Sequence, residues 1–353
     1  MKGQFFAVGL TVLSLMFGAS NLAKADPIVI KKGQQTEAGI MLPGNGSSPG
    51  TVVMKQYIES ASNGELKMEI YGDDSLGNGR STLEQCQNGI IQMVHQYTNI
   101  MAPMVPEIAV TAIPFAVPNH QTMWRVMAGP FGKELADVVL KRTGMRVLSW
   151  GEGCGFRNLY SKSPVNVPED LKKLRVRVPE NPGLMAMFQA MGTKTVTITW
   201  AEIYTGMQSG TADALETELY SYAWKKLDEV CPYITFTQHG YNMHPLLINE
   251  KFFQSLSPKH KKIILEGAEL YTTVTDGHSR VTEAVLLEDM MKKGAKVYFP
   301  TEEERAKWRE AGMKAYVDIT AKKAGQEWVD KFFNAVKAAE EELDAEVKAV
   351  SAK

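Results

Sequence analysis

Apolar and polar residues recur with two different periods along the first half of the chain, and each period predicts a type of element. Residues 66–71 (LKMEIY) alternate strictly, which is typical of a half-buried strand. Residues 51–62 carry apolar positions at helical spacing and end at Asn63-Gly64, a helix-end signal. The same order continues with predicted strands at 28–30, 90–94 and 145–150 and predicted helices at 80–88 and 124–141. Strands and helices that alternate with short links predict a parallel α/β architecture.

A second series of the same kind begins after a glycine-rich stretch at 151–155, where a strand at 156–160 would cross into a second lobe. The predicted strands of this series are 175–178, 195–198, 213–219, 234–237 and 245–248, and its predicted helices are 182–191 and 201–209. Residues 259–291 have few helix breakers and predict one helix long enough to brace both lobes. The remaining residues, from 301 onward, predict two or three more amphipathic helices.

Composition and charge exclude several classes of protein. A chain of 353 residues with 44% hydrophobic side chains has enough apolar material for two packed lobes. Its 39 Lys and Arg against 40 Asp and Glu leave no basic excess for a phosphate backbone, so we expect no nucleic-acid partner. Three cysteines are too few for a disulfide scaffold, and we expect them to be small buried apolar residues. A pairing of Cys154 with Cys231 stays open at this stage.

The N-terminus predicts export. Residues 1–25 carry a positive charge at Lys2, an apolar stretch at 5–17 and an A-x-A cleavage site at 23–25. The apolar stretch is shorter than the roughly 20 residues that a membrane helix needs, which favours a cleaved secretory signal peptide over an anchor. We therefore expect a periplasmic product.

Motifs for catalysis or metal binding are scarce. The six histidines form no HExxH motif, and the chain has no G-x-S-x-G elbow, no phosphate-binding G-x-x-x-x-G-K-[ST] loop and no G-x-G-x-x-G opening a helix. His239 and His244 lie five apart in a strand-like segment, which is weak evidence for a metal site. We expect no cofactor and no metal.

The most informative segment is residues 168–182. Arg175 and Arg177 lie two apart on a short strand and so point to the same side. Pro179 and Pro182 end that strand at its carboxyl end, where α/β sheets present ligands. The planar guanidinium fork can hold a carboxylate or a sulfonate through two hydrogen bonds. The alternative is a surface arginine paired with a neighbouring acid.

This segment resembles the "PeDLkGlkiRvP" signature of the solute-binding proteins of tripartite ATP-independent periplasmic (TRAP) transporters, the family that includes C4-dicarboxylate-binding proteins. Further motifs that resemble the family follow in the same order along almost the whole chain: Asn63–Leu66, Leu76-Gly77, Gln87–Gly89, Ile113–Phe115, Glu202–Gly210 and Ala212-Asp213. The resemblance implies a two-lobe α/β fold of the periplasmic binding protein type, with a long helix spanning both lobes. We predict lobe I at residues 26–152 and about 240–283, and lobe II at 153–239 and about 284–353.

The resemblance also implies a set of ligand-binding residues. Arg177 matches the arginine that clamps a carboxylate, and Trp200 matches an aromatic position that lines the pocket. Arg157 matches a frequent basic position on the crossing strand. Glu216 matches the acid of the family's "EN" pair, whose asparagine is replaced here by Thr217.

Two further ligand contacts are expected from less certain positions. Tyr97 falls where other members place a polar pocket residue, after the strand at 90–94. The loop after Ile30 is longer than is typical of the family, and we expect Gln35, or one of its neighbours Gln34 and Thr36, to contact the ligand from it.

These residues predict a binding protein that captures a small organic acid in the cleft between the lobes and delivers it to membrane subunits of a TRAP permease. A single well-matched clamp arginine favours a small monoanion over a bulky dianion. A small sulfonate, similar to isethionate or taurine, remains an alternative ligand because it suits the same guanidinium fork. The alternative of a different class is a secreted enzyme acting on a small organic acid, with Glu216 or His95 as general base.

Overall fold

The computed structural model describes residues 26–34, 47–72 and 74–351. The predicted signal peptide and the predicted contact Gln35 lie outside these residues. The strands are β1 (Ile28–Gly33), β2 (Leu66–Tyr71), β3 (Met93–His95), β4 (Met145–Ser161), β5 (Arg175–Val178), β6 (Lys194–Thr197), β7 (Ala214–Glu218), β8 (Tyr233–Asn249) and β9 (Lys296–Tyr298).

Helices alternate with these strands through most of the chain. The α-helices are α1 (Ser47–Ala61), α2 (Gly79–Gln87), α3 (Thr98–Met101), α4 (His120–Ala128), α5 (Pro130–Thr143), α6 (Pro182–Ala190), α7 (Ile203–Gln208), α8 (Leu219–Trp224), α9 (Glu250–Ser255), α10 (Pro258–Lys292), α11 (Glu302–Ala324) and α12 (Gln326–Ser351). Short 3-10 helices lie at Pro106–Ala112, Pro168–Lys173 and Leu227–Glu229.

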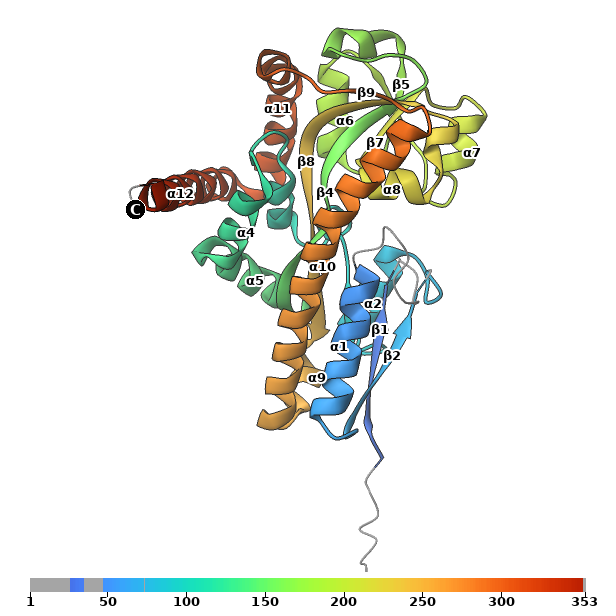
Figure 1. Cartoon of the computed structure of the whole chain (residues 1–353). Coiled ribbons are helices and arrows are strands. Elements are labelled where there is room, and N and C mark those ends of the chain that lie inside the picture. Colours follow the sequence, from blue (N-terminus) through green and yellow to red (C-terminus); the bar gives the residue numbers. More distant parts are fainter. Residues whose placement is uncertain (1–25, 35–46, 73, 352–353) are drawn as a thin grey trace, which may run out of the picture.

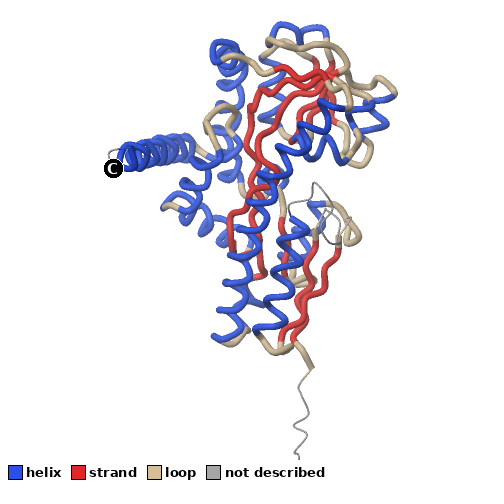
Figure 2. Tube along the Cα trace, viewed as in Figure 1, coloured by secondary structure: helices blue, strands red, loops and turns tan. Residues whose placement is uncertain are grey.

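The strands form one sheet with the order β2-β1-β3-β8-β4-β7-β5-β6, and β9 pairs with β8. We call β1–β3 with α1–α3 the first lobe, and β5–β7 with α6–α8 the second lobe; they lie at the bottom and top of Figure 1. Strands β4 and β8 run antiparallel to each other through both lobes (Figure 2). β3 pairs with the last residues of β8, whereas β7 pairs with the last residues of β4. The fold is thus the two-lobe α/β type that was expected.

The long helix α10 runs over both lobes, as the sequence predicts (Figure 1). It begins at a favourable cap, because the Ser257 side chain accepts a hydrogen bond from the His260 backbone N–H and Pro258 occupies the first helical position. Its first half packs against α1 in the first lobe, and farther along it contacts β4 and then α8 of the second lobe. One rigid element therefore touches both lobes.

Two predicted elements have different bounds in the structure. The predicted helix at 124–141 is in fact two helices, α4 and α5, because the chain turns at Gly129 and Pro130 starts a new helix. The predicted strand at 90–94 begins only at Met93. Ile90 instead belongs to the C-terminal cap of α2. Gly89 ends the helix with a φ of +74°, and the backbone N–H of Ile90 then donates to the Gln85 carbonyl.

The largest difference concerns the central strands. The predicted strands at 145–150 and 156–160 are parts of the single strand β4, and those at 234–237 and 245–248 are parts of β8. Register shifts occur in the β4–β8 pairing, one of them between Glu152 and Phe156. Almost every residue of β8 is buried, because neighbours cover both of its faces.

The C-terminal helices form a layer beside the central strands, on the left of Figure 1. Helix α11 packs against α6 and the 3-10 helix at Pro106–Ala112, whereas α12 packs against α4 and α11. The predicted residue limits of the two lobes stay a prediction. Among the described residues, no helix is both long and apolar enough to cross a membrane.

Candidate binding site

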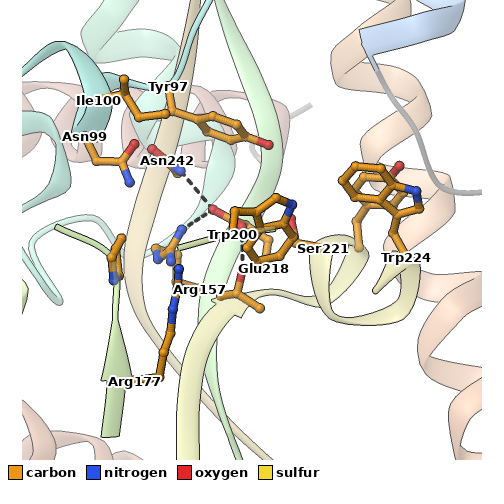
Figure 3. Close-up of a pocket in the computed structure, with 13 residues that line it drawn as sticks. Tyr97, Asn99, Ile100, Arg157, Arg177, Trp200, Glu218, Ser221, Trp224 and Asn242 are labelled. Atoms are coloured by element: carbon orange, nitrogen blue, oxygen red, sulfur yellow. Dashed lines mark hydrogen bonds and ion pairs between the residues drawn. The ribbon is translucent and has the colours of Figure 1, made fainter. Parts of the chain in front are cut away.

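A pocket opens where the carboxyl ends of β3, β5 and β7 meet (Figure 3). The first lobe supplies Tyr97, which directly follows β3, and α3, whereas the second lobe supplies the ends of β5 and β7 and the helix α8. The cavity measures about 130 Å³. This is close to the roughly 150 Å³ that holds one benzene molecule in an engineered protein interior. Its lining residues are Tyr97, Asn99, Ile100, Arg157, Arg177, Pro179, Trp200, Thr217, Glu218, Tyr220, Ser221, Trp224 and Asn242.

Arg177 enters the pocket from β5 with most of its hydrogen-bonding capacity uncommitted. Its Nε and Nη2 atoms donate to the backbone carbonyl of Ile198 at 3.0 and 2.8 Å, and no described residue forms an ion pair with it. Burial lowers the pKa of Arg177 to about 10, so the guanidinium stays protonated at neutral pH. Within the described part of the chain, its hydrogen-bond acceptor is a neutral carbonyl and three of its five N–H groups have no acceptor, so this buried cation is a ready site for an anion.

Arg157 on β4 is committed to two carboxylates of β7. It donates from Nε to Glu216 at 2.5 Å, from Nη1 to Glu218 at 2.5 Å, and from Nη2 to both a carboxylate oxygen and the backbone carbonyl of Glu216. The pairing of β4 with β7 produces this geometry, because Arg157 lies directly opposite Glu218, and Glu216 is two residues away on the same face. Burial alone would lower the pKa of Arg157, but the two carboxylates outweigh it and raise that pKa.

Glu216 lies behind Arg157 and is fully buried. Its carboxylate also faces His239 of β8, whose Nε2 is 3.4 Å away. Burial acts to raise the pKa of Glu216, but the charge of Arg157 and the hydrogen bonds from His239 and Arg157 lower it to about 2. The carboxylate is therefore ionised at any physiological pH and serves to hold Arg157 in place.

Glu218 has a carboxylate that faces the pocket and is anchored from three sides. Besides Arg157, it accepts hydrogen bonds from Asn242 Nδ2 at 2.9 Å and from the Thr217 hydroxyl at 3.0 Å. Asn242 is itself oriented by the Thr98 hydroxyl at 3.4 Å. This network, drawn with dashed lines in Figure 3, fixes a negative charge beside the cavity.

Aromatic side chains form the wall on the side of α8. Trp200 and Trp224 lie 6.4 Å apart between ring centroids, and the Tyr220 ring is parallel to that of Trp224 at 6.3 Å. The Arg177 guanidinium lies 5.9 Å from the Trp200 ring centroid. Lys225 lies over the rings of Trp200 and Trp224 at 5.7 and 5.0 Å. These contacts hold the rings as flat apolar surfaces next to Arg177.

Most of the predicted site residues meet in this one pocket. Five of them line it: Tyr97, Arg157, Arg177, Trp200 and Thr217. Glu216 does not reach the cavity, because its carboxylate is bound to Arg157. The expected ligand contact of Glu216 stays a prediction that this arrangement does not favour, and Gln35 lies outside the described residues.

Several lining residues were missed by the sequence analysis. Glu218 carried a detectable signal, because it lies two residues after Glu216 on a predicted strand and therefore on the same face. Asn242 carried none, because it lies in the middle of β8, in a stretch where no strand was predicted. Trp224 and Tyr220 reach the pocket only because α8 turns back over the end of β7.

The structure offers little for the enzymatic alternative. His95 does not line the pocket; it is buried against Lys32, whose Nζ is 3.0 Å from His95 Nδ1, and burial lowers the pKa of His95. Glu216 is ion-paired and has a low pKa, so it is a poor general base. Across residues 26–34, 47–72 and 74–351, no group of three or more His, Cys, Asp or Glu residues is arranged to hold a metal ion.

Comparisons with known proteins identify the family of this chain. The family model for bacterial extracellular solute-binding proteins of family 7 matches residues 45–323. The C4-dicarboxylate-binding periplasmic protein of Rhodobacter capsulatus is 27% identical over 306 residues, which cover 86% of this chain and 89% of that protein.

Solved structures match over nearly the same length. The sugar acid binding protein of Advenella mimigardefordensis, in complex with galactonate, gives a TM-score of 0.81 at 25% identity and covers 89% of this chain and 99% of that one. A TRAP periplasmic solute-binding protein of Ochrobactrum anthropi, with its C-terminus bound in the ligand-binding pocket, gives a TM-score of 0.81 at 28% identity. That match covers 90% of this chain and 97% of the other.

Proposed function

Since the chain belongs to family 7 of the bacterial extracellular solute-binding proteins, a family of TRAP binding proteins and not of enzymes, we propose that it captures a small carboxylic acid and delivers it to a TRAP permease. The acid group would sit on Arg177, in the pocket between the two lobes. The relatives named above include periplasmic proteins, and this supports the periplasmic location that the N-terminal segment predicts.

A single observation carries this proposal. Arg177 is a buried, protonated guanidinium that lines a cavity and has three N–H groups without a partner among the described residues. Leaving such a group unpaired in a low-dielectric site is unfavourable, and a carboxylate would satisfy it through two parallel hydrogen bonds. The ligands named for the relatives, a C4-dicarboxylate and galactonate, are carboxylates and support this chemistry.

The decisive experiment compares two arginines of the same strand. We expect Arg177→Ala to weaken the binding of the acid selected by a thermal-shift screen by about 30-fold or more in a calorimetric titration, because losing one partner of a buried charge pair costs about 2–5 kcal/mol. Arg175→Ala is the matched control, since Arg175 is exposed and ion-paired with Asp213 outside the pocket. Equal affinity of the Arg177→Ala variant and the unaltered protein would remove Arg177 from the site.

The nature of the acid group is tested with isosteres. Titration of β-alanine against taurine, and of 3-hydroxypropionate against isethionate, changes only the carboxylate to a sulfonate. We expect the carboxylate to bind more tightly in each pair, because its planar two-oxygen edge matches the free edge of Arg177. Tighter binding of both sulfonates would favour the alternative ligand class.

A further inference from the structure

The two arginines of the pocket differ in what they can still bind. Arg157 uses four of its five N–H groups on Glu216 and Glu218, whereas Arg177 uses two. Without a ligand, the two positive charges of Arg157 and Arg177 are balanced by the two negative charges of Glu216 and Glu218. The pocket therefore has one place for a carboxylate, and a second carboxylate on the ligand would meet no uncommitted cation among the lining residues.

Alongside hydroxyl, amide and indole donors, the pocket presents several oxygen acceptors. The Glu218 carboxylate faces the cavity, and the hydroxyl of Thr217 donates its proton to Glu218, which leaves the Thr217 oxygen with lone pairs only. Asn242 commits its Nδ2 to Glu218 and its Oδ1 to Thr98. The Oδ1 atom of Asn99 is buried and has no hydrogen-bond partner in the described part of the chain. A ligand that satisfies these atoms must donate hydrogen bonds.

The remaining surface of the pocket is flat and apolar. Trp200, Tyr220 and Trp224 present their rings on one side, and Ile100 and Pro179 add aliphatic surface. A planar body of about six ring atoms fits both this wall and the size of the cavity. A polyhydroxylated chain would lose the hydration of the hydroxyls that face these rings.

We propose that the ligand is a planar, ring-bearing monocarboxylate that carries a hydrogen-bond donor, such as a phenolic hydroxyl or a ring N–H. Its carboxylate binds Arg177, its ring stacks on the tryptophan wall, and its donor binds the Glu218 carboxylate. This inference rests on the proposed function and narrows the class of acid.

The test uses 4-hydroxybenzoate as probe and changes one feature of it at a time. Calorimetric titrations compare it with 4-fluorobenzoate, which lacks the donor, with terephthalate, which has a carboxylate in place of the hydroxyl, and with succinate, which lacks the ring. We expect 4-hydroxybenzoate to bind at least about tenfold more tightly than each of the other three. 4-Fluorobenzoate would leave a buried acceptor unpaired, terephthalate would bring a second carboxylate near Glu218, and succinate would lose the contact with the rings. Tighter binding of terephthalate or succinate would overturn the inference.

A variant then assigns the selectivity to Glu218. Glu218→Gln keeps the shape of the side chain but removes its charge, so the preference for 4-hydroxybenzoate over 4-fluorobenzoate and over terephthalate should shrink about tenfold. The readout is the ratio of two ligand affinities measured on the same variant, so a general loss of affinity cancels. Circular dichroism checks that the variant is folded. Glu229→Gln is the matched control, because Glu229 binds Tyr204 away from the pocket. Unchanged ratios in Glu218→Gln would exclude Glu218 as the selective group.

The possible failures of this proposal and of the proposed function are distinct. If succinate or galactonate binds in a manner that Arg177→Ala abolishes while 4-hydroxybenzoate does not bind, the ligand class is wrong and the carboxylate-binding function stands. If none of these acids binds and the broader acid screen is also negative, both proposals fail.

Discussion

Asp276 is an acidic side chain of α10 placed where ionisation is costly. It lies opposite β4, and its Oδ1 accepts a hydrogen bond from the backbone N–H of Glu152 at 2.8 Å. Burial raises the pKa of Asp276 from 3.8 to about 7, and the nearby Glu152 carboxylate acts in the same direction. A helix that contacts both lobes thus carries a carboxyl group that titrates near neutrality.

The pH dependence of stability follows from the sign of this shift. Between about pH 4 and 7 the folded state binds more protons at Asp276 than the unfolded state, so this group makes stability fall as the pH rises through that window. Asp276→Asn keeps the Oδ1 acceptor without the charge. We expect it to raise the melting temperature at pH 8 and to give little or no gain at pH 4, measured by scanning calorimetry at both values. An equal gain in melting temperature at both pH values would contradict a raised pKa of Asp276 in the folded protein.

Single residues also show where sequence reasoning reaches its limit. The position of Arg177 was predictable, because a strand followed by two prolines places its last side chains at the ligand edge of the sheet. The ion pairs of Arg157 were not predictable. Its partners Glu216 and Glu218 are about 60 residues away along the chain, and only the pairing of β4 with β7 brings them together. The sequence pattern identified Arg177 and the family resemblance identified Arg157, but only the strand register shows that Arg157 is ion-paired with Glu216 and Glu218.

Among the elements, α6 and α11 approach each other closely at a glycine. A side chain at Gly183 of α6 would come within 2.7 Å of the Tyr316 ring of α11. Tyr316 is buried, and its position is fixed by a hydrogen bond to the Ala109 carbonyl. We expect Gly183→Ala to destabilise the protein by about 1–3 kcal/mol through overpacking, measured by chemical unfolding. A neutral or stabilising effect would mean that α11 can shift away from α6.

Gly277 on α10 provides the opposite case. It is exposed in the interior of the helix, and an added Cβ would meet nothing within 4 Å. Gly277→Ala should therefore stabilise the protein by about 0.5–1 kcal/mol, because alanine loses less backbone entropy in a helix. The same unfolding experiment measures it, and a loss of stability would indicate that the helix must deform at this point.

Helices and short strands were predictable from local patterns, whereas the central strands were not. The long stretch with few helix breakers at residues 259–291 predicts α10 from the sequence alone. In β4, the glycines at 151–155 interrupt the apolar pattern and gave the impression of two strands. Pairing with β8 along nearly its whole length makes β4 a single strand, and that pairing depends on residues about 100 positions away.

At the scale of the whole molecule, β4, β8 and α10 join the two lobes, and the pocket draws its walls from both. The register shift between Glu152 and Phe156 lies midway along β4. There the carboxylate of Glu152 is bound by His120 of α4, Tyr241 of β8 and Arg280 of α10. A register shift of this kind bends a strand locally, and side chains of three other elements meet at this bend.

Closure of the lobes is then the last prediction. A ligand held by Arg177 of the second lobe also faces Tyr97 and Asn99 of the first lobe, so it bridges the two lobes and should favour their closed population. We expect the radius of gyration, measured by small-angle X-ray scattering, to fall as ligand is added and to follow the calorimetric isotherm. Arg177→Ala should abolish the change and Arg175→Ala should retain it. A constant radius at saturating ligand would mean that binding uses a preformed pocket, with selectivity set entirely by the groups already in contact.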